Sequence, residues 1–99
     1  MLHKVKAVRG RPDFKIEVLF EQNECALIDL SDFVATGEVT APLRADPDVF
    51  VSALRVVDDG EAIGWPGDVE IDADALWYNA HPEDWERDYG ALRLQGHAT

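Results

Sequence analysis

The stretch Phe14-Lys15-Ile16-Glu17-Val18-Leu19-Phe20 decides the fold class, because apolar side chains recur in it at every second position. Successive side chains of a β-strand point to opposite faces, so Phe14, Ile16, Val18 and Phe20 would share one face. A helix would need its apolar residues three and four positions apart. This segment therefore predicts an amphipathic β-strand with one face in the core.

The neighbouring segments extend this strand into an antiparallel sheet. Residues 4–9 alternate polar and apolar, with Val5, Ala7 and the Val8 side expected inward, and residues 10–13 have turn chemistry. A short loop at 22–24 leads to residues 25–30, a strand apolar enough to be central in the sheet. Cys25, at its start, is expected to be a small core residue.

Short helices are predicted next. Ser31 or Asp32 could cap one helical turn, and residues 41–43 are interpreted as an extended linker. Asp46-Pro47-Asp48 is a strong helix start, with Asp46 as N-cap and Pro47 at the first helical position. The helix that follows should run for about two turns with Phe50, Ala53 and Leu54 on one face.

The second half of the chain predicts a hairpin, a strand and two more helices. Residues 55–58 and 62–65 flank Asp59-Gly60, a good hairpin signal. Val69 and Ile71 alternate with carboxylates, and Asp72 is expected to cap a helix at 73–78. A further helix is expected from His81-Pro82 to about Tyr89, followed by a tail. The fold class is therefore α+β, with a small antiparallel sheet of five to six strands and two or three short helices. A compact domain should span 1–78, and 79–99 should form a C-terminal helix and tail on or beside it.

Length and composition favour one globular domain. The chain has 99 residues, 46% of them hydrophobic, which supports a hydrophobic core that needs no disulfide or metal to hold it. Its single cysteine excludes an internal disulfide and suits a reducing compartment. The sequence shows neither an apolar run long enough to span a membrane nor a signal-peptide segment at its start. The expected location is the cytoplasm.

The charge is strongly negative and unevenly placed. The net charge is −11, yet residues 1–20 carry five basic and two acidic residues. Residues 58–88 hold eleven acidic residues and one arginine. A field of this sign repels nucleic acid and anionic lipid and attracts basic protein surfaces. The N-terminal cations are expected to pair with acids across the sheet.

The motifs argue against catalysis, cofactors and metals. Neither a nucleophile with its base nor a phosphate-binding glycine loop stands out in the sequence. Counted from Asp68, the calcium-loop positions that want glycine and glutamate hold Ala73 and Asn79. His81 lies near acids, but the other histidines, His3 and His97, are near the two ends of the chain. No catalytic, cofactor or metal site is predicted.

The candidate site is the stretch Asp68-Val69-Glu70-Ile71-Asp72-Ala73-Asp74, in which carboxylates recur every second residue. On a strand they would share one face. The plain alternative is a solvated edge strand that runs into a helix cap. Aromatic residues further on could anchor a protein interface, or the C-terminal helix could fold back and cover them. The predicted partner-binding residues are Asp68, Glu70, Asp72, Asp74, Trp77, Glu83, Asp84 and Trp85.

The order of these features over residues 3–78 resembles the bacterial domain of unknown function 2442 family. The resemblance is carried by the strand 14–20, the exit Asp29-Leu30-Ser31, Ala41-Pro42-Leu43-Arg44, Trp65-Pro66 and the acidic stretch that ends in Leu76-Trp77. It implies a compact α+β fold and almost no function. Some relatives carry an additional helix-turn-helix domain, and others lie beside a second small protein in arrangements that look like toxin–antitoxin pairs.

The sequence thus favours a non-enzymatic acidic domain that occupies a basic, nucleic-acid-binding surface of a partner protein. An antitoxin, or a phage-type inhibitor such as an anti-CRISPR protein that mimics nucleic acid, would fit. The expected partners include neither nucleic acid itself nor a membrane, and the chain would be a monomer or homodimer. The alternatives are a regulatory or scaffold domain that dimerises, and a small uncharacterised enzyme.

Overall fold

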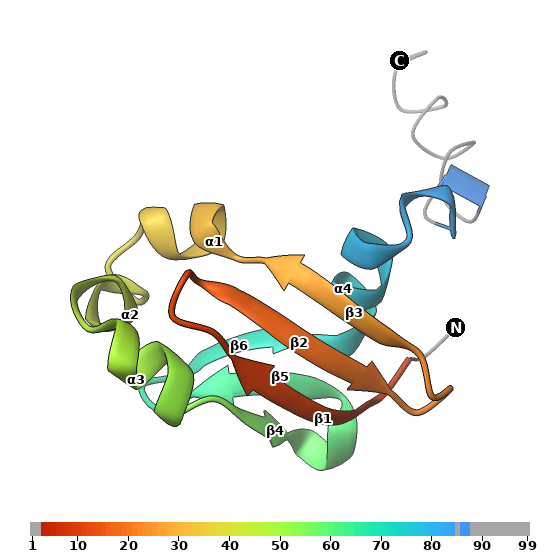
Figure 1. Ribbon diagram of the computed structural model, residues 1–99, viewed down its shortest axis with the longest axis horizontal. Helices are drawn as coiled ribbons and strands as arrows, with labels where there is room; N and C mark the ends of the chain where they lie inside the picture. Colours follow the sequence, from red (N-terminus) through yellow and green to blue (C-terminus); the bar gives the residue numbers. More distant parts are fainter. Residues whose placement is uncertain (1–2, 85, 88–99) are drawn as a thin grey trace.

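The computed structural model describes residues 3–84 and 86–87. Two three-stranded antiparallel sheets form its framework (Figure 1). The N-terminal sheet contains β1 (Val5–Gly10), β2 (Lys15–Phe20) and β3 (Cys25–Asp29), and the C-terminal sheet contains β4 (Arg55–Val57), β5 (Ala62–Trp65) and β6 (Val69–Asp72). The labelled helices are α1 (Ser31–Ala35), α2 (Ala41–Ala45), α3 (Pro47–Ser52) and α4 (Ala73–Ala80), with a 3₁₀ turn, η1, at Asp58–Gly60. Residues 82–84 and 86–87 are also helical.

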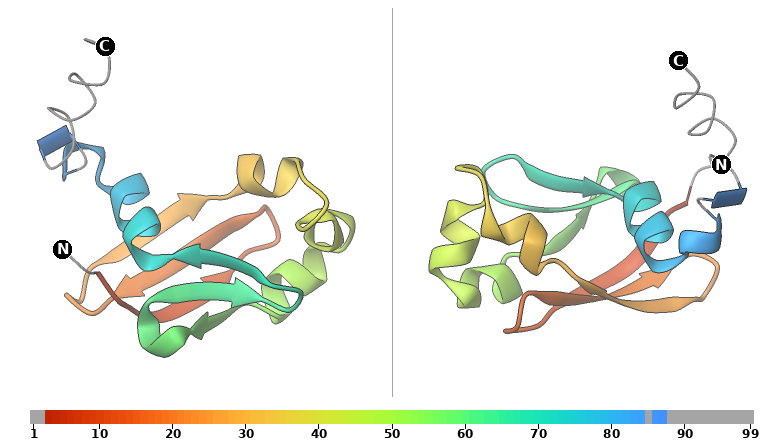
Figure 2. Two further views of the ribbon diagram at one scale, coloured as in Figure 1. Left: turned by 180° about the vertical axis from the view of Figure 1, so that it is seen from behind. Right: turned by 90° about the horizontal axis from the view of Figure 1, so that it is seen from above.

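The two sheets form separate layers, which corrects the expectation of one sheet of five to six strands. The segment that contains α1, α2 and α3 lies between β3 and β4 and covers one end of the layers, while α4 covers the other end (Figure 2). The chain therefore returns on the opposite layer, and β4 lies against β1 without joining its ladder. Periodicity predicts that a strand exists but not which strand it pairs with, so the sequence could not separate these sheets.

The N-terminal sheet follows the predicted alternation in its central strand, β2. Ile16, Val18 and Phe20 are buried, and Phe14, just before the strand, is half-buried. In β1 the register shifts between Val5 and Ala7, a β-bulge that turns Ala7 outward, against the expectation that it faces the core.

The third strand also departs from the sequence prediction. Strand β3 lies at the edge of its sheet rather than at the centre, since β2 is the strand with two neighbours. Cys25 is exposed instead of buried. Its strand buries Ile28 on the inner face, and the alternation places Cys25 and Leu27 outward. The apolar run suggested burial on both faces, but only one face meets the core.

The short helices begin where local chemistry favours them. Asp46 caps α3, because its carboxylate accepts a hydrogen bond from the Asp48 backbone at 3.1 Å, as predicted. Residues 41–45 form α2 rather than an extended linker, since Pro42 lies in the first turn, where a missing N–H costs nothing. Before α1, the Asp29 carboxylate accepts from the Ser31 backbone at 2.9 Å.

The β4–β5 hairpin is held against the N-terminal sheet by Gly60. Three successive residues of its turn, Asp58, Asp59 and Gly60, have positive φ. Gly60 has φ +91°, and a Cβ there would lie 2.9 Å from the Val5 carbonyl oxygen. Only glycine fits this position, because a side chain would strain the backbone and collide with β1.

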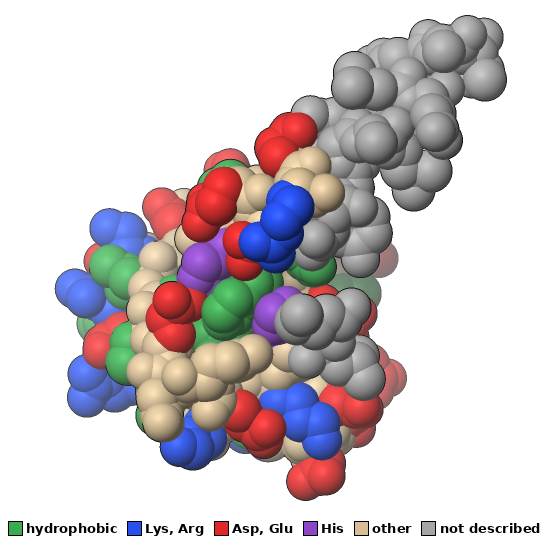
Figure 3. Space-filling model, turned by 90° about the vertical axis from the view of Figure 1, so that its right-hand side faces the viewer, with side chains coloured by type: hydrophobic (Ala, Val, Ile, Leu, Met, Phe, Trp, Pro, Cys, Tyr) green, Lys and Arg blue, Asp and Glu red, His purple; other side chains and the backbone are tan. Residues whose placement is uncertain are grey.

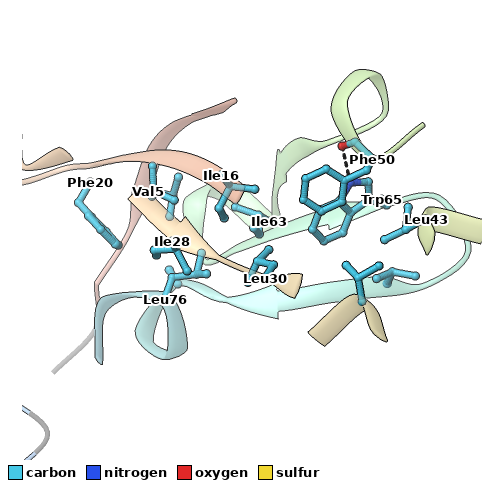
Figure 4. Packing of buried hydrophobic residues seen from close by; sticks show 14 residues of the cluster. Val5, Ile16, Phe20, Ile28, Leu30, Leu43, Phe50, Ile63, Trp65 and Leu76 are labelled. Atoms are coloured by element: carbon cyan, nitrogen blue, oxygen red, sulfur yellow. Dashed lines mark hydrogen bonds between the residues drawn. The ribbon is translucent and has the colours of Figure 1, made fainter. Parts of the chain in front are cut away.

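One hydrophobic core fills the space between the layers (Figure 4). Trp65 is its largest fully buried side chain, and its indole nitrogen donates to the Phe50 carbonyl at 2.9 Å. The Phe50 ring stacks on Trp65 with a centroid distance of 5.3 Å. The remaining buried residues come from both sheets, from α1, α2 and α4, and from the segment before α1: Val5, Ile16, Val18, Phe20, Ile28, Leu30, Val34, Leu43, Ile63, Val69, Ala73 and Leu76. The core thus joins the two sheets into one unit.

Candidate functional site

The acidic stretch around β6 has the alternation that the sequence predicts. Val69 is buried and Ile71 half-buried, while Glu70 and Asp72 are exposed on the outer face of the C-terminal sheet. Asp68 precedes the strand with φ +63°, at the end of the turn that begins at Pro66. The strand therefore presents its carboxylates to solvent because the core takes the alternate apolar side chains.

Another acidic residue lies near the C-terminal end of β6. Asp72 pairs in register with Ala62, and the Ala73 backbone donates to the Glu61 carbonyl at 2.8 Å. This bond holds the η1 turn beside the start of α4, so Glu61 lies near Asp72. The name acidic surface is used below for the exposed carboxylates of η1, β6 and their flanks: Asp58, Asp59, Glu61, Asp68, Glu70 and Asp72.

The acidic surface is poorly compensated by basic side chains. Its one ion pair among residues 3–84 and 86–87 joins Asp59 to Lys4 at 3.8 Å, and the Asp59 side chain is fully exposed. Arg55 shares the outer face with Glu70, but the register places Gly64 of β5 between them. Among residues 3–84 and 86–87, no ion pair joins the Arg55 and Glu70 side chains. The carboxylates of β6 therefore face solvent without a cation.

Two of the predicted partner-binding acids instead serve contacts within the fold. The Asp74 carboxylate accepts a hydrogen bond from the His3 backbone at 2.6 Å, across 71 residues of sequence. The Asp84 carboxylate accepts from the Trp77 indole at 3.0 Å and pairs with Arg87 at 3.3 Å. Glu83 is exposed, and Trp85 lies outside the described residues.

Trp77 is half-buried and is the centre of an aromatic stack. Its ring stacks on His3 at a centroid distance of 4.2 Å and on His81 at 3.9 Å, and the Phe20 ring meets it edge-on at 5.0 Å. Figure 3 shows the two histidines on one face of the molecule, with hydrophobic side chains between them and acidic side chains around them. His3, Trp77 and His81 are called the histidine–tryptophan stack below.

His81 links the end of α4 to the β2–β3 hairpin. Its Nδ1 lies 2.9 Å from the Trp77 carbonyl oxygen, and its Nε2 contacts the Glu24 carboxylate. Partial burial lowers the pKa of His81, but the Trp77 carbonyl, the Glu24 carboxylate and the nearby Asp84 charge together outweigh it and raise that pKa above its ordinary value. The Gln22 amide lies 3.3 Å from Nδ1 of the other stacked histidine, His3.

The sequence prediction missed this stack because its members are far apart along the chain. His3 precedes β1 and Glu24 lies in the β2–β3 hairpin, and no local pattern connects either to residue 77 or 81. The spacing of Trp77 and His81 was a usable signal, since residues four apart on a helix are neighbours.

The outer face of the N-terminal sheet has balanced charges. Arg9 pairs with Glu17 at 2.7 Å, and Lys15 and Arg11 each lie 3.8 Å from Asp13, in line with the predicted pairing of N-terminal cations. The Arg9 side chain donates to Glu17 and lowers the pKa of that carboxyl. Beside the pair lies a shallow depression of about 250 Å³ with a mostly apolar lining that includes Ala7, Leu19 and Cys25.

The described residues offer no group of three or more histidine, cysteine or acidic side chains that could hold a metal ion. Across residues 3–84 and 86–87, the helices are all too short or too polar to cross a membrane.

The chain matches a known protein family over most of its length. A family model described as "Protein of unknown function (DUF2442)" matches residues 5–82. The chain belongs to this family. The family match agrees with the resemblance seen in the sequence, and it extends two residues beyond the end of α4.

One solved structure shares the fold. The crystal structure of a "Putative DNA Binding Protein" from Nitrosomonas europaea ATCC 19718 superposes with a TM-score of 0.71 at 18% sequence identity. The alignment covers 91% of this chain and 63% of that chain, so this chain spans less than two-thirds of that protein. A search of curated proteins gives no match.

Proposed function

We propose that this chain is a non-enzymatic binding domain whose acidic surface occupies a basic surface on another protein. The observation that carries the proposal is the exposure of Glu61, Glu70 and Asp72 on one side of the C-terminal sheet, without an ion pair in the described part of the chain. Like charges this close repel one another, and a basic partner relieves that repulsion.

The charge distribution suits a partner that normally binds nucleic acid. Such partners present clustered lysine and arginine side chains to phosphate, and a rigid row of carboxylates offers them alternative acceptors. The row is rigid here because Val69 and Ile71 pack into the core between the carboxylates. An antitoxin, or a phage-type inhibitor such as an anti-CRISPR protein, would use such a surface as a nucleic-acid mimic.

Direct binding to DNA is the competing function. The Nitrosomonas protein is named for it, but that similarity at 18% identity concerns the fold. In this chain the net charge is −11, and Arg9 and Lys15 of the N-terminal sheet are paired with acids, while Lys6 donates to the Asn23 side chain. Both features oppose contact with phosphate. The proposal therefore assigns a basic protein, and not DNA, to the acidic surface.

An NMR titration with an arginine-rich peptide of ten residues tests the proposal. We expect the largest chemical-shift changes at residues 58–61 and 68–72, and an affinity that falls steeply with added salt. Reversal of Glu61, Glu70 and Asp72 to lysine should abolish binding. Duplex DNA with a negative charge equal in magnitude to the positive charge of the peptide should leave the spectrum of the unmodified protein unchanged.

A matched variant separates surface from net charge. Reversal of the exposed acids Glu21, Asp32 and Glu38 to lysine makes the same change in net charge at other places on the molecule. This control should keep most of the affinity. Equal losses in the two variants would show that net charge alone attracts the peptide, and the assigned surface would then be wrong.

A further inference from the structure

The two ring nitrogens of His81 both face hydrogen-bond acceptors. Nδ1 lies 2.9 Å from the Trp77 carbonyl oxygen, which also accepts from the His81 backbone at 2.9 Å. Nε2 contacts an oxygen of the Glu24 carboxylate. A carbonyl oxygen and an ionised carboxylate can accept a hydrogen bond but cannot donate one.

Only the protonated imidazole satisfies both contacts. A neutral ring carries one N–H, so the other nitrogen would direct its lone pair at an oxygen. Two positions in the fold favour the cation further. His81 follows the last residue of α4, where the helix dipole stabilises positive charge, and its ring lies against the face of Trp77.

We propose that His81 is a pH-sensitive latch that, as an imidazolium, holds the turn at residues 81–84 against the β2–β3 hairpin and releases it on losing its proton. The inference is independent of the partner proposed above, because it concerns contacts within one chain. Deprotonation leaves either the Trp77 carbonyl or the Glu24 carboxylate facing a lone pair. The link between the C-terminal turn and the N-terminal sheet is then broken or repulsive.

The charged and titratable groups around the latch come from every neighbouring segment. Glu24 faces His81 from the hairpin, and Asp84 lies in the following turn between Trp77 and Arg87. His3 lies on the opposite side of the Trp77 ring, and Asp74 holds the His3 backbone. Both carboxylates near His81 favour its cation, and they outweigh the partial burial of the ring, which favours the neutral form.

The direction of the pH effect follows from the raised pKa of His81. The latch contributes its full stabilisation below the unfolded-state value of about 6.5. That contribution is lost as the pH rises through the higher folded-state pKa. The turn is therefore docked below about pH 6.5 and released once the pH exceeds the raised folded-state pKa of His81.

Nitrogen-15 NMR of the imidazole rings between pH 5 and 9 tests the latch on the full chain. We expect both His81 nitrogens to show imidazolium shifts at low pH, with a single titration above about 6.5. The Trp77 indole signal should move with the same midpoint. The heteronuclear NOE of the Glu83 and Asp84 amides should fall through that midpoint, because the turn gains motion when it is released.

Two variants in the same hairpin make the test specific. Replacement of Glu24 by glutamine removes the charged acceptor and should shift the His81 midpoint to lower pH. Replacement of Glu21 by glutamine makes the same charge change at an exposed residue and should leave the midpoint in place. A midpoint at or below about 6.5, an unchanged midpoint in Glu24→Gln, or constant NOE values would each overturn the latch.

Discussion

The two sheets of this domain share a core and have the same strand topology, but the charges on their outer faces differ. Each is a three-stranded antiparallel sheet in chain order, and the inner faces of both contribute to one cluster. On the N-terminal sheet, Arg9 and Glu17 neutralise each other at 2.7 Å. On the C-terminal sheet, Glu70 and Asp72 are exposed without a cation beside them in the described part of the chain. The core constrains only the inward residues, so the outward positions can serve binding.

The central strands differ as well. Strand β2 alternates between buried and half-buried residues, while all four residues of β5 are buried. Gly64 of β5 is covered on the outer side by its neighbours, since a Cβ there would lie 3.2 Å from Glu70 Cγ and 3.6 Å from Val57 Cγ1. The small residues of β5 let the stem of Glu70 lie across the sheet while its carboxylate stays in solvent.

The largest expected effect concerns whether the two sheets unfold together. Trp65→Ala removes the largest buried side chain and its bond to the Phe50 carbonyl, and it should lower the free energy of unfolding by about 3–5 kcal/mol. Because the core is shared, hydrogen exchange should accelerate equally in β2 and β5. Trp65→Phe should cost less, since it keeps most of the packing. Protection that survived in β2 alone would break the comparison and make the sheets separate units.

A smaller effect isolates the contact between the β4–β5 hairpin and β1. Gly60 and Gly67 have nearly equal φ, +91° and +92°, but only at Gly60 would a Cβ meet the Val5 carbonyl, at 2.9 Å. Gly67→Ala should cost about 1–2 kcal/mol from backbone strain alone. Gly60→Ala should cost about 1–3 kcal/mol more, because β1 must move. Urea unfolding measures both. Equal costs would mean that the hairpin and β1 separate freely.

The smallest expected effect is the change in stability when one outer carboxylate is neutralised, and its sign should differ between the two sheets. Glu17→Gln breaks the pair with Arg9 and should lower stability slightly, whereas Glu70→Gln removes unrelieved repulsion and should raise it slightly. Added salt should shrink both differences. Thermal unfolding at low and high salt gives the comparison, and equal signs would remove the distinction between the outer surfaces.

The pH dependence of stability should also distinguish the paired charges of the N-terminal sheet from the unpaired carboxylates of the C-terminal sheet. Arg9 holds the pKa of Glu17 below its ordinary value, chiefly through a hydrogen bond. The pair therefore stabilises the fold above the unfolded-state pKa of glutamate, and this contribution is lost as the pH falls through the lower folded-state pKa. The difference between Glu17→Gln and the unmodified protein should vanish in that acidic range.

Local chemistry made most elements predictable from the sequence. The alternation in 14–20 gave β2, the Asp46-Pro47 start gave α3, and the pattern around Val69 gave β6. In each case the decisive interactions lie within a few residues of one another. The acidic face of β6 followed for the same reason, because one strand's alternation decides which side chains face outward.

The errors come from interactions between distant segments. Whether Cys25 is central or at an edge depends on which strands flank β3, and Ala7 faces outward because of a bulge against β2. Asp74 could be recognised as exposed or internal only after β1 was known to bring His3 beside it. The separation of six strands into two sheets is the same problem at a larger scale.

The hydrogen bond between His3 and Asp74 has a topological consequence. It closes a loop of 72 residues, so the first strand and the last helix of the domain lie together. A short linker could then join the start of β1 to the end of α4, and the chain could be opened at Gly67, where the turn has free space around it. The domain is in this sense nearly circular. It would accept insertion into another protein's surface loop, with its acidic surface still facing outward.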